Sequence, residues 1–232
     1  MTDYRTLLVL ANSVKKNARC IAGREIVSRT SHYEIGGWIR PITDHDEGAV
    51  FPVESVLHSG KQPKVMQFVQ VPLARHVPEK AQPENWMIAS GKQWTSVNHL
   101  YQQPGMSMLV QTPSQLWQDA ACTNDRISVV NVRPSRTWGS LYLIHVRELV
   151  ISFGWRDGKK RRRAEFAFNG LNYDFGMTDP DVEIHYGHCY PPQNKPACRF
   201  YANQQKPCYL CASLTPPFRG FHYKVVATVF EG

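Results

Sequence analysis

Short apolar stretches alternate with turn residues along the second half of the chain. The run 140–153 is rich in Leu, Ile, Val, Phe and Tyr, and apolar and polar residues alternate over 164–168. A period of two, with β-branched and aromatic residues, is typical of strands. Asp157-Gly158 and Asn169-Gly170 separate these runs from each other and from 171–175, and both dipeptides favour two-residue hairpin turns. The pattern predicts a meander of three antiparallel strands.

The rest of the second half predicts two more strands. Residues 178–207 have no periodic pattern, and the apolar runs Cys208–Leu214 and Phe221–Phe230 follow them. A three-strand meander, a long connection and a final strand pair are the element order of the OB-fold, a five-stranded barrel that often binds oligonucleotides. Other small barrels share this order, and among them we favour the OB-fold.

The first half shows a weaker version of the same series. Strands are predicted at Thr6–Leu10, Arg19–Val27, Trp38–Pro41 and Val65–Leu73. Between the halves, Thr112–Trp117 begins with Thr-Pro before an apolar pair, which favours a short helix.

The sequence therefore predicts a mostly β protein with two OB-like small barrels in tandem and a partly helical linker region. The first domain, an OB-like barrel plus a helical connection, is expected over residues 1–131, and the second barrel over 132–232.

Composition excludes several classes of protein. With 232 residues, 42% hydrophobic and 20% charged, the chain is neither intrinsically disordered nor a coiled coil. No apolar run approaches the ~20 residues of a membrane-spanning helix, and the first five residues do not resemble a signal peptide. We expect a soluble, cytoplasmic protein without a membrane partner.

Positive charge is concentrated in the second half. The net charge of the basic chain is +8, of which +2 falls in residues 1–131 (13 Lys/Arg against 11 Asp/Glu) and +6 in 132–232 (14 against 8). The segment 156–163 holds six cations in eight residues and spans a predicted hairpin turn. A solvated turn that aids solubility is one interpretation, but six cations within eight residues repel one another without an anionic partner. We favour phosphate binding by Arg156, Lys159, Lys160, Arg161, Arg162 and Arg163.

Aromatic residues lie among these charges. Base stacking on barrel aromatics contributes about 1–3 kcal/mol per base in single-strand binders. Alternation places Phe166 and Phe168 in the core, whereas Trp155 and Tyr173 are candidate stacking rings.

The first barrel offers weaker binding candidates. Arg40, together with Lys16 and Arg19, would extend the nucleic-acid-binding surface, although Arg40 also fits a structural role at a strand edge beside Pro41. We expect Trp38 to fill the core of this barrel.

Late cysteines offer a competing hypothesis of structural zinc. The candidates are Cys189, Cys198, Cys208 and Cys211, with the last two at a C-x₂-C spacing. Against zinc, Cys208 and Cys211 lie on one predicted strand, where alternation separates the thiols. We favour free thiols and expect no other cofactor.

Catalysis has little support in the sequence. No P-loop, dinucleotide-binding turn, H-E-x-x-H or G-x-S-x-G motif occurs. Two acidic clusters would suit a metal-dependent nuclease: residues 44–47, and Asp174, Asp179, Asp181 and Glu183 with Lys159 or Lys160. Thr178-Asp179-Pro180 is more simply a turn or cap, so we predict no catalytic residues.

Several short strings resemble one family in their order along the chain. They are Ala11-Asn12-Ser13 with Lys15 or Lys16, Arg19–Gly23, Trp38–Pro41, Gln82–Trp86, Thr178–Pro180, Ser213-Leu214 and Tyr223–Ala227. In this order the chain resembles the prokaryotic dual OB-containing domain family. The resemblance implies two OB-like barrels, recognition of nucleic acid or nucleotides, and a place in antiviral defence or other conflict systems.

Together these observations favour a non-enzymatic module that binds DNA or RNA through backbone and stacking contacts. The resemblance implies a partner protein, such as a nuclease or ATPase, that supplies enzymatic activity. A sensor of a small nucleotide or modified base is the alternative, and a metal-dependent nuclease is a further one.

Overall fold

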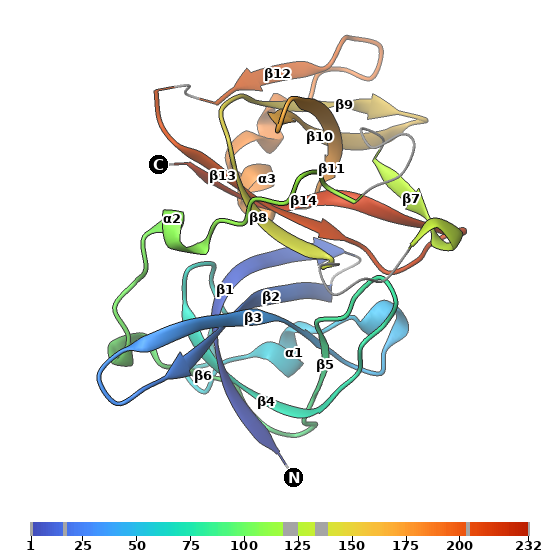
Figure 1. Cartoon of the computed structure of the whole chain (residues 1–232). Helices are drawn as coiled ribbons and strands as arrows, with labels where there is room; N and C mark the ends of the chain where they lie inside the picture. The colour runs from blue at the N-terminus through green and yellow to red at the C-terminus, as the bar shows by residue number, and fades with distance from the viewer. Residues whose placement is uncertain (1, 16–17, 118–124, 133–138, 203–204, 232) are drawn as a thin grey trace. The chain divides into compact units, whose positions relative to one another are not determined.

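A computed structural model describes residues 2–15, 18–117, 125–132, 139–202 and 205–231 (Figure 1). The chain is mostly β, with 51% strand and 13% helix, as predicted. It forms two compact units. The first contains the described residues of Met1–Leu109 and Arg133–Ser140, and the second contains those of Val110–Val132 and Leu141–Gly232. No helix in the described part of the chain is long and apolar enough to cross a bilayer.

The first unit is a closed five-stranded barrel. Its strands run in the order β1-β2-β3-β5-β4, and β4 returns to pair with β1. The β3–β5 pair is parallel and the other pairs are antiparallel. The elements are β1 (Asp3–Lys15), β2 (Ala18–Ser28), β3 (Tyr33–Ile42), η1 (Asp46–Gly48), α1 (Pro52–Ser55), β4 (Phe68–His76), β5 (Asn85–Ile88), β6 (Thr95–Ser96), η2 (Asn98–Leu100) and α2 (Met106–Leu109).

Strand β1 closes the barrel because it bends and pairs on both sides. Its first part pairs with β4 and its longer part with β2, and the β2 register shifts between Val9 and Ala11. At the bend, a Cβ on Gly23 would lie 2.2 Å from the carbonyl oxygen of Leu8. Only glycine permits this close approach of the two backbones.

The core of the first barrel is built from alternating strand residues around a tryptophan. That tryptophan is Trp94, which is fully buried among residues such as Leu7, Val9 and Val69. The expectation that Trp38 fills this core is wrong. Trp38 is only half-buried, and the Arg24 guanidinium carbon lies 5.9 Å from its ring centroid.

The second unit contains the predicted meander. The two predicted turns place Asp157, Gly158, Asn169 and Gly170 at positive φ (53°, 68°, 49° and 77°), as two-residue hairpins of this type require. The elements are β7 (Arg126–Ser128), η3 (Val129–Asn131), β8 (Leu141–Val146), β9 (Leu149–Arg156), β10 (Lys159–Phe168), β11 (Leu171–Met177), α3 (Pro180–Tyr186), η4 (Gly187–Cys189), β12 (Cys198–Tyr201), β13 (Cys208–Leu214) and β14 (Phe221–Glu231).

The strand order of the second unit repeats that of the first. Its sheet runs β12-β9-β10-β11-β14-β13-β8. Strands β8 and β9 are separated only by Arg147 and Glu148, and they pair with β13 and β10 respectively. Together β8 and β9 therefore do what bent β1 does in the first barrel. The predicted single strand over 140–153 is interrupted at this point.

The long connection 178–207 carries a helix and an edge strand. Asp179 caps α3 by accepting a hydrogen bond from the Asp181 N–H (2.8 Å), and Pro180 occupies the first turn. Asp179 also accepts from the Val229 N–H at 2.8 Å, which ties the helix to β14. Thr112–Trp117, in contrast, contains no helix, and the helix prediction there is wrong.

Candidate nucleic-acid interface

The β9–β10 hairpin carries the predicted basic cluster. Arg156 pairs with Lys159 across the turn, and Trp155 pairs with Lys160. Arg156 is 80% exposed and lies 4.0 Å from the equally exposed Asp157, a distance at which an ion pair contributes little. We call the exposed cations of this turn the hairpin tip: Arg156, Lys159, Lys160 and Arg161.

Strand alternation sends the cations of β10 to two different faces. Burial at Ala164, Phe166 and Phe168 marks the core face. Lys160 and Arg162 lie on the same side as these residues. The opposite, outer face carries Lys159, Arg161, Arg163 and Glu165.

The two cations on the core side meet groups of α3, of its N-cap and of the segment that follows it. The Lys160 ammonium lies 4.5 Å from the Tyr190 ring centroid. Arg162 pairs with Glu183 at 3.0 Å and donates to the Asp179 carbonyl at 3.4 Å. Desolvation, followed by the charge of Glu183, raises the pKa of Tyr190 to about 12, so its phenol is neutral at physiological pH.

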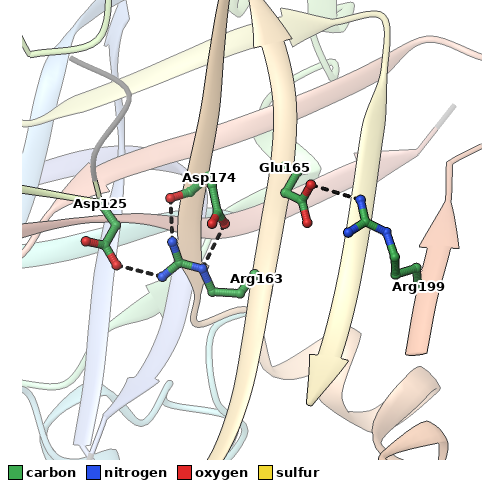
Figure 2. A network of polar contacts seen from close by, with 5 residues as sticks. All are labelled: Asp125, Arg163, Glu165, Asp174 and Arg199. Atoms are coloured by element: carbon green, nitrogen blue, oxygen red, sulfur yellow. Dashed lines mark hydrogen bonds and ion pairs between the residues drawn. The ribbon is translucent and has the colours of Figure 1, made fainter. Parts of the chain in front are cut away.

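Arg163 on the outer face is held by two carboxylates. Its Nη1 lies 2.7 Å from Asp125, and its Nε lies 2.8 Å from Asp174 (Figure 2). Its Nη2 also donates to the Asp174 carbonyl at 2.6 Å. A second pair, between Arg199 and Glu165 at 2.9 Å, lies on the same face.

The six predicted phosphate-binding cations therefore fall into two groups. The four of the tip are exposed, whereas Arg162 and Arg163 are engaged in ion pairs. Sequence reasoning missed these partners because Asp125 is 38 residues from Arg163 and Glu183 is 21 from Arg162. No local pattern indicates such pairings.

The two candidate stacking rings behave differently. Trp155 is partly exposed, and its indole N–H donates to the Pro191 carbonyl at 2.6 Å. Tyr173 is only 2% exposed and stacks on Phe166 at 5.4 Å, while its hydroxyl accepts from the Leu116 N–H at 3.2 Å. Tyr173 is a core residue, and its prediction as a stacking ring is wrong.

Arg40 is also buried, at 2% exposure. It donates to the Ser140 hydroxyl at 2.9 Å. The Ser140 N–H and hydroxyl in turn donate to the two oxygens of Glu84 at 2.6 and 2.8 Å. Arg40 belongs to a buried polar cluster, so its prediction as a nucleic-acid contact is wrong.

The other two candidates of the first barrel are Arg19 and Lys16. Arg19 is half-buried, and its backbone exchanges hydrogen bonds with Val50 (2.7 and 3.2 Å). Lys16 lies outside the described residues.

The late cysteines form no metal centre in the described part of the chain. Cys208 and Cys211 are buried, and Cys189 and Cys198 are half-buried. Burial, with a smaller effect from Glu231, raises the pKa of Cys208 to about 12. Among the described residues, no three His, Cys, Asp or Glu side chains are placed to hold a metal.

The acidic clusters have structural partners instead. Asp174 pairs with Arg163, and Asp179 caps α3. In the first cluster, His45 Nε2 lies 3.0 Å from Glu54.

Both barrels and their connection match one family model. The dual OB-containing domain model covers residues 5–229, nearly the whole chain. The chain belongs to this family. No protein of curated function matches it. Two solved structures match over 99% of this chain and 92% of theirs, described as "Molecular basis for abrogation of activation of pro-inflammatory cytokines" (9% identity, TM-score 0.33) and "Structural mimicry for functional antagonism" (10%, 0.29).

OB-folds bind oligonucleotides on one face of the barrel, together with the loops that follow the first and fourth barrel strands. In the second barrel the first of them is the hairpin tip. The other joins β13 to β14, where Arg219 lies 5.2 Å from the ring of half-exposed Phe218. Beside it, Arg126 of β7 lies 4.5 Å from the Phe221 ring. Sequence reasoning missed this second set of cations and aromatic rings.

Proposed function

We propose that the second barrel of this dual OB protein binds nucleic acid through its hairpin tip. The observation that supports the proposal is the exposure of four cations that flank one two-residue turn. Apart from the long Arg156–Asp157 contact, no ion pair engages them within the described residues. Phosphate oxygens are the natural partners of such a group of Lys and Arg side chains.

Two further features support binding in this region. The hairpin tip lies on the loop between the first two barrel strands, which flanks the ligand face in OB-folds. Trp155 and Tyr190 lie next to it, with ring centroids 6.1 Å apart, and both are partly exposed. Rings beside cations suit a ligand that carries both bases and phosphates.

The proposal includes a cytoplasmic location and a partner protein with enzymatic activity, such as a nuclease or ATPase of a defence system. These two parts rest on the family and on the composition. The module itself positions nucleic acid and carries out no chemistry.

Binding of labelled single-stranded DNA, double-stranded DNA and RNA of equal length tests the proposal. The test variant replaces Arg156, Lys159, Lys160 and Arg161 with Gln. A matched control replaces four exposed lysines of the first barrel with Gln: Lys61, Lys64, Lys80 and Lys92. Both variants lower the net charge equally. The proposal expects a large loss of affinity in the tip variant only, and equal affinities would overturn it.

A further inference from the structure

The outer face of β10 carries a row of three cations: Lys159, Arg161 and Arg163. Alternate residues of a strand lie about 7 Å apart on one face. The first two are exposed and have no ion pair within the described residues, whereas Arg163 is neutralised by two carboxylates. Only Lys159 and Arg161 of this row therefore carry a positive charge that no neighbouring carboxylate offsets within the described residues.

The neighbours of Arg163 on the two adjacent strands are small residues. Its register partners are Ser152 on β9 and Gly176 on β11, and both are small. A Cβ added to Gly176 would meet only Val225, at 3.7 Å. No bulky side chain therefore stands directly opposite Arg163 on either adjacent strand, and the Arg163 side chain keeps 28% of its surface exposed.

Asp174 makes more contacts with Arg163 than Asp125 does. Asp174 lies on the adjacent strand and receives two bonds, one through its backbone carbonyl. Asp125 makes one side-chain contact from the segment before β7. Its backbone carbonyl accepts from the Lys224 N–H at 2.8 Å, so the segment stays attached without the carboxylate contact.

The guanidinium is a charged fork that binds carboxylate and phosphate alike. Burial by itself would lower the pKa of Arg163, but hydrogen bonds to Asp174 and Asp125 and their negative charges raise it above its ordinary value. Arg163 is therefore a permanent cation at the end of the row, and Asp125 is the carboxylate more easily displaced.

We propose that Asp125 competes, within the chain, with a nucleic-acid phosphate for Arg163. This inference rests on the proposed function of the hairpin tip. A strand that binds along Lys159 and Arg161 brings its next phosphate toward Arg163, displaces Asp125 and extends the contact by one cation. Asp125 thus limits both the affinity and the length of the contact along β10.

Asp125→Asn tests the inference, because it removes the charge and keeps the size and a hydrogen-bond acceptor. Glu165→Gln is the matched control, since it changes the net charge equally and breaks the other ion pair of the same face. Affinities are measured for single-stranded DNA and RNA of about 20 nucleotides, longer than the ~4–16 that one OB-fold covers. Thermal melts of each variant verify folding.

The inference expects Asp125→Asn to bind about threefold more tightly than Glu165→Gln, the scale of one partly exposed ion pair. The gain should vanish in Asp125→Asn/Arg163→Gln. Equal gains in affinity in the two single variants, or no gain in either, would overturn the inference. The proposed function would still stand if affinity depends on the cations of the hairpin tip. An absence of binding by wild type and Asp125→Asn would overturn both. If Asp125→Asn unfolds, Asp125→Ser replaces it.

Discussion

The buried polar cluster of the first barrel permits a stringent test of the structure. Glu84 receives two hydrogen bonds from Ser140, which is fully buried, and Arg40 donates to the same hydroxyl. Glu84→Ala removes both acceptors, so the buried N–H and hydroxyl of Ser140 lose the carboxylate to which they donate. Removing one partner from a buried charged network costs about 3–5 kcal/mol.

This change would consume a large part of the ~5–15 kcal/mol that stabilises a typical domain. We expect urea titration, followed by tryptophan fluorescence, to show a loss of about 3 kcal/mol or more in the free energy of unfolding. Glu79→Ala, at an exposed position, is the control and should change it by less than about 0.5 kcal/mol. A loss below about 1 kcal/mol for Glu84→Ala would refute the reasoning.

Three further predictions concern single residues of the two barrels. Gly23→Ala should destabilise the protein by more than about 2 kcal/mol, because the added Cβ would collide with the Leu8 carbonyl oxygen. Gly37→Ala is the control and should leave stability unchanged, because a Cβ there meets no atom within 4 Å. Thermal melts compare the two variants. Tyr173→Phe should cost about 1 kcal/mol in urea unfolding through its lost hydrogen bond and leave nucleic-acid affinity unchanged; a marked loss of affinity would restore it as a contact residue. The pKa of Cys208 is raised from 9.0 to about 12, so its thiol contributes stability below the unfolded-state pKa, and that contribution is lost as pH rises through 9 toward 12. Urea midpoints should therefore fall less steeply over this range in Cys208→Ala than in wild type.

Turn chemistry and alternation made the meander predictable. Asp-Gly and Asn-Gly dictate two-residue turns wherever they join alternating strands, and the structure forms both. The exposure of the hairpin tip was predictable from the same local pattern, because a tight turn flanked by charged residues projects into solvent. These are local properties, and one sequence is sufficient to determine them.

The fates of Arg40 and Tyr173 were not predictable in this way. Arg40 is buried because Ser140, 100 residues away, and Glu84 supply its polar surroundings. Tyr173 is buried because Phe166 covers its ring and the chain near Leu116 bonds its hydroxyl. An isolated arginine or tyrosine in a strand has the same local pattern whether it faces solvent or a distant segment.

The interruption between β8 and β9 was missed for a related reason. The run 140–153 remains rich in apolar residues, and the break at Arg147 and Glu148 arises because the two parts pair with different strands. Barrel closure, a long-range requirement, decides where the strand breaks. The bent β1 of the first barrel meets the same requirement with a bulge.

The salt dependence of binding tests the central claim most directly. Each phosphate contact contributes about 0.7 to the slope of log K against log[salt] for single strands. If the four cations of the tip contact phosphates, their replacement by Gln should reduce the slope by roughly 3. The control with Lys61, Lys64, Lys80 and Lys92 replaced should lose less than about 1. Equal reductions in the two variants, or an unchanged slope in the tip variant, would contradict the account.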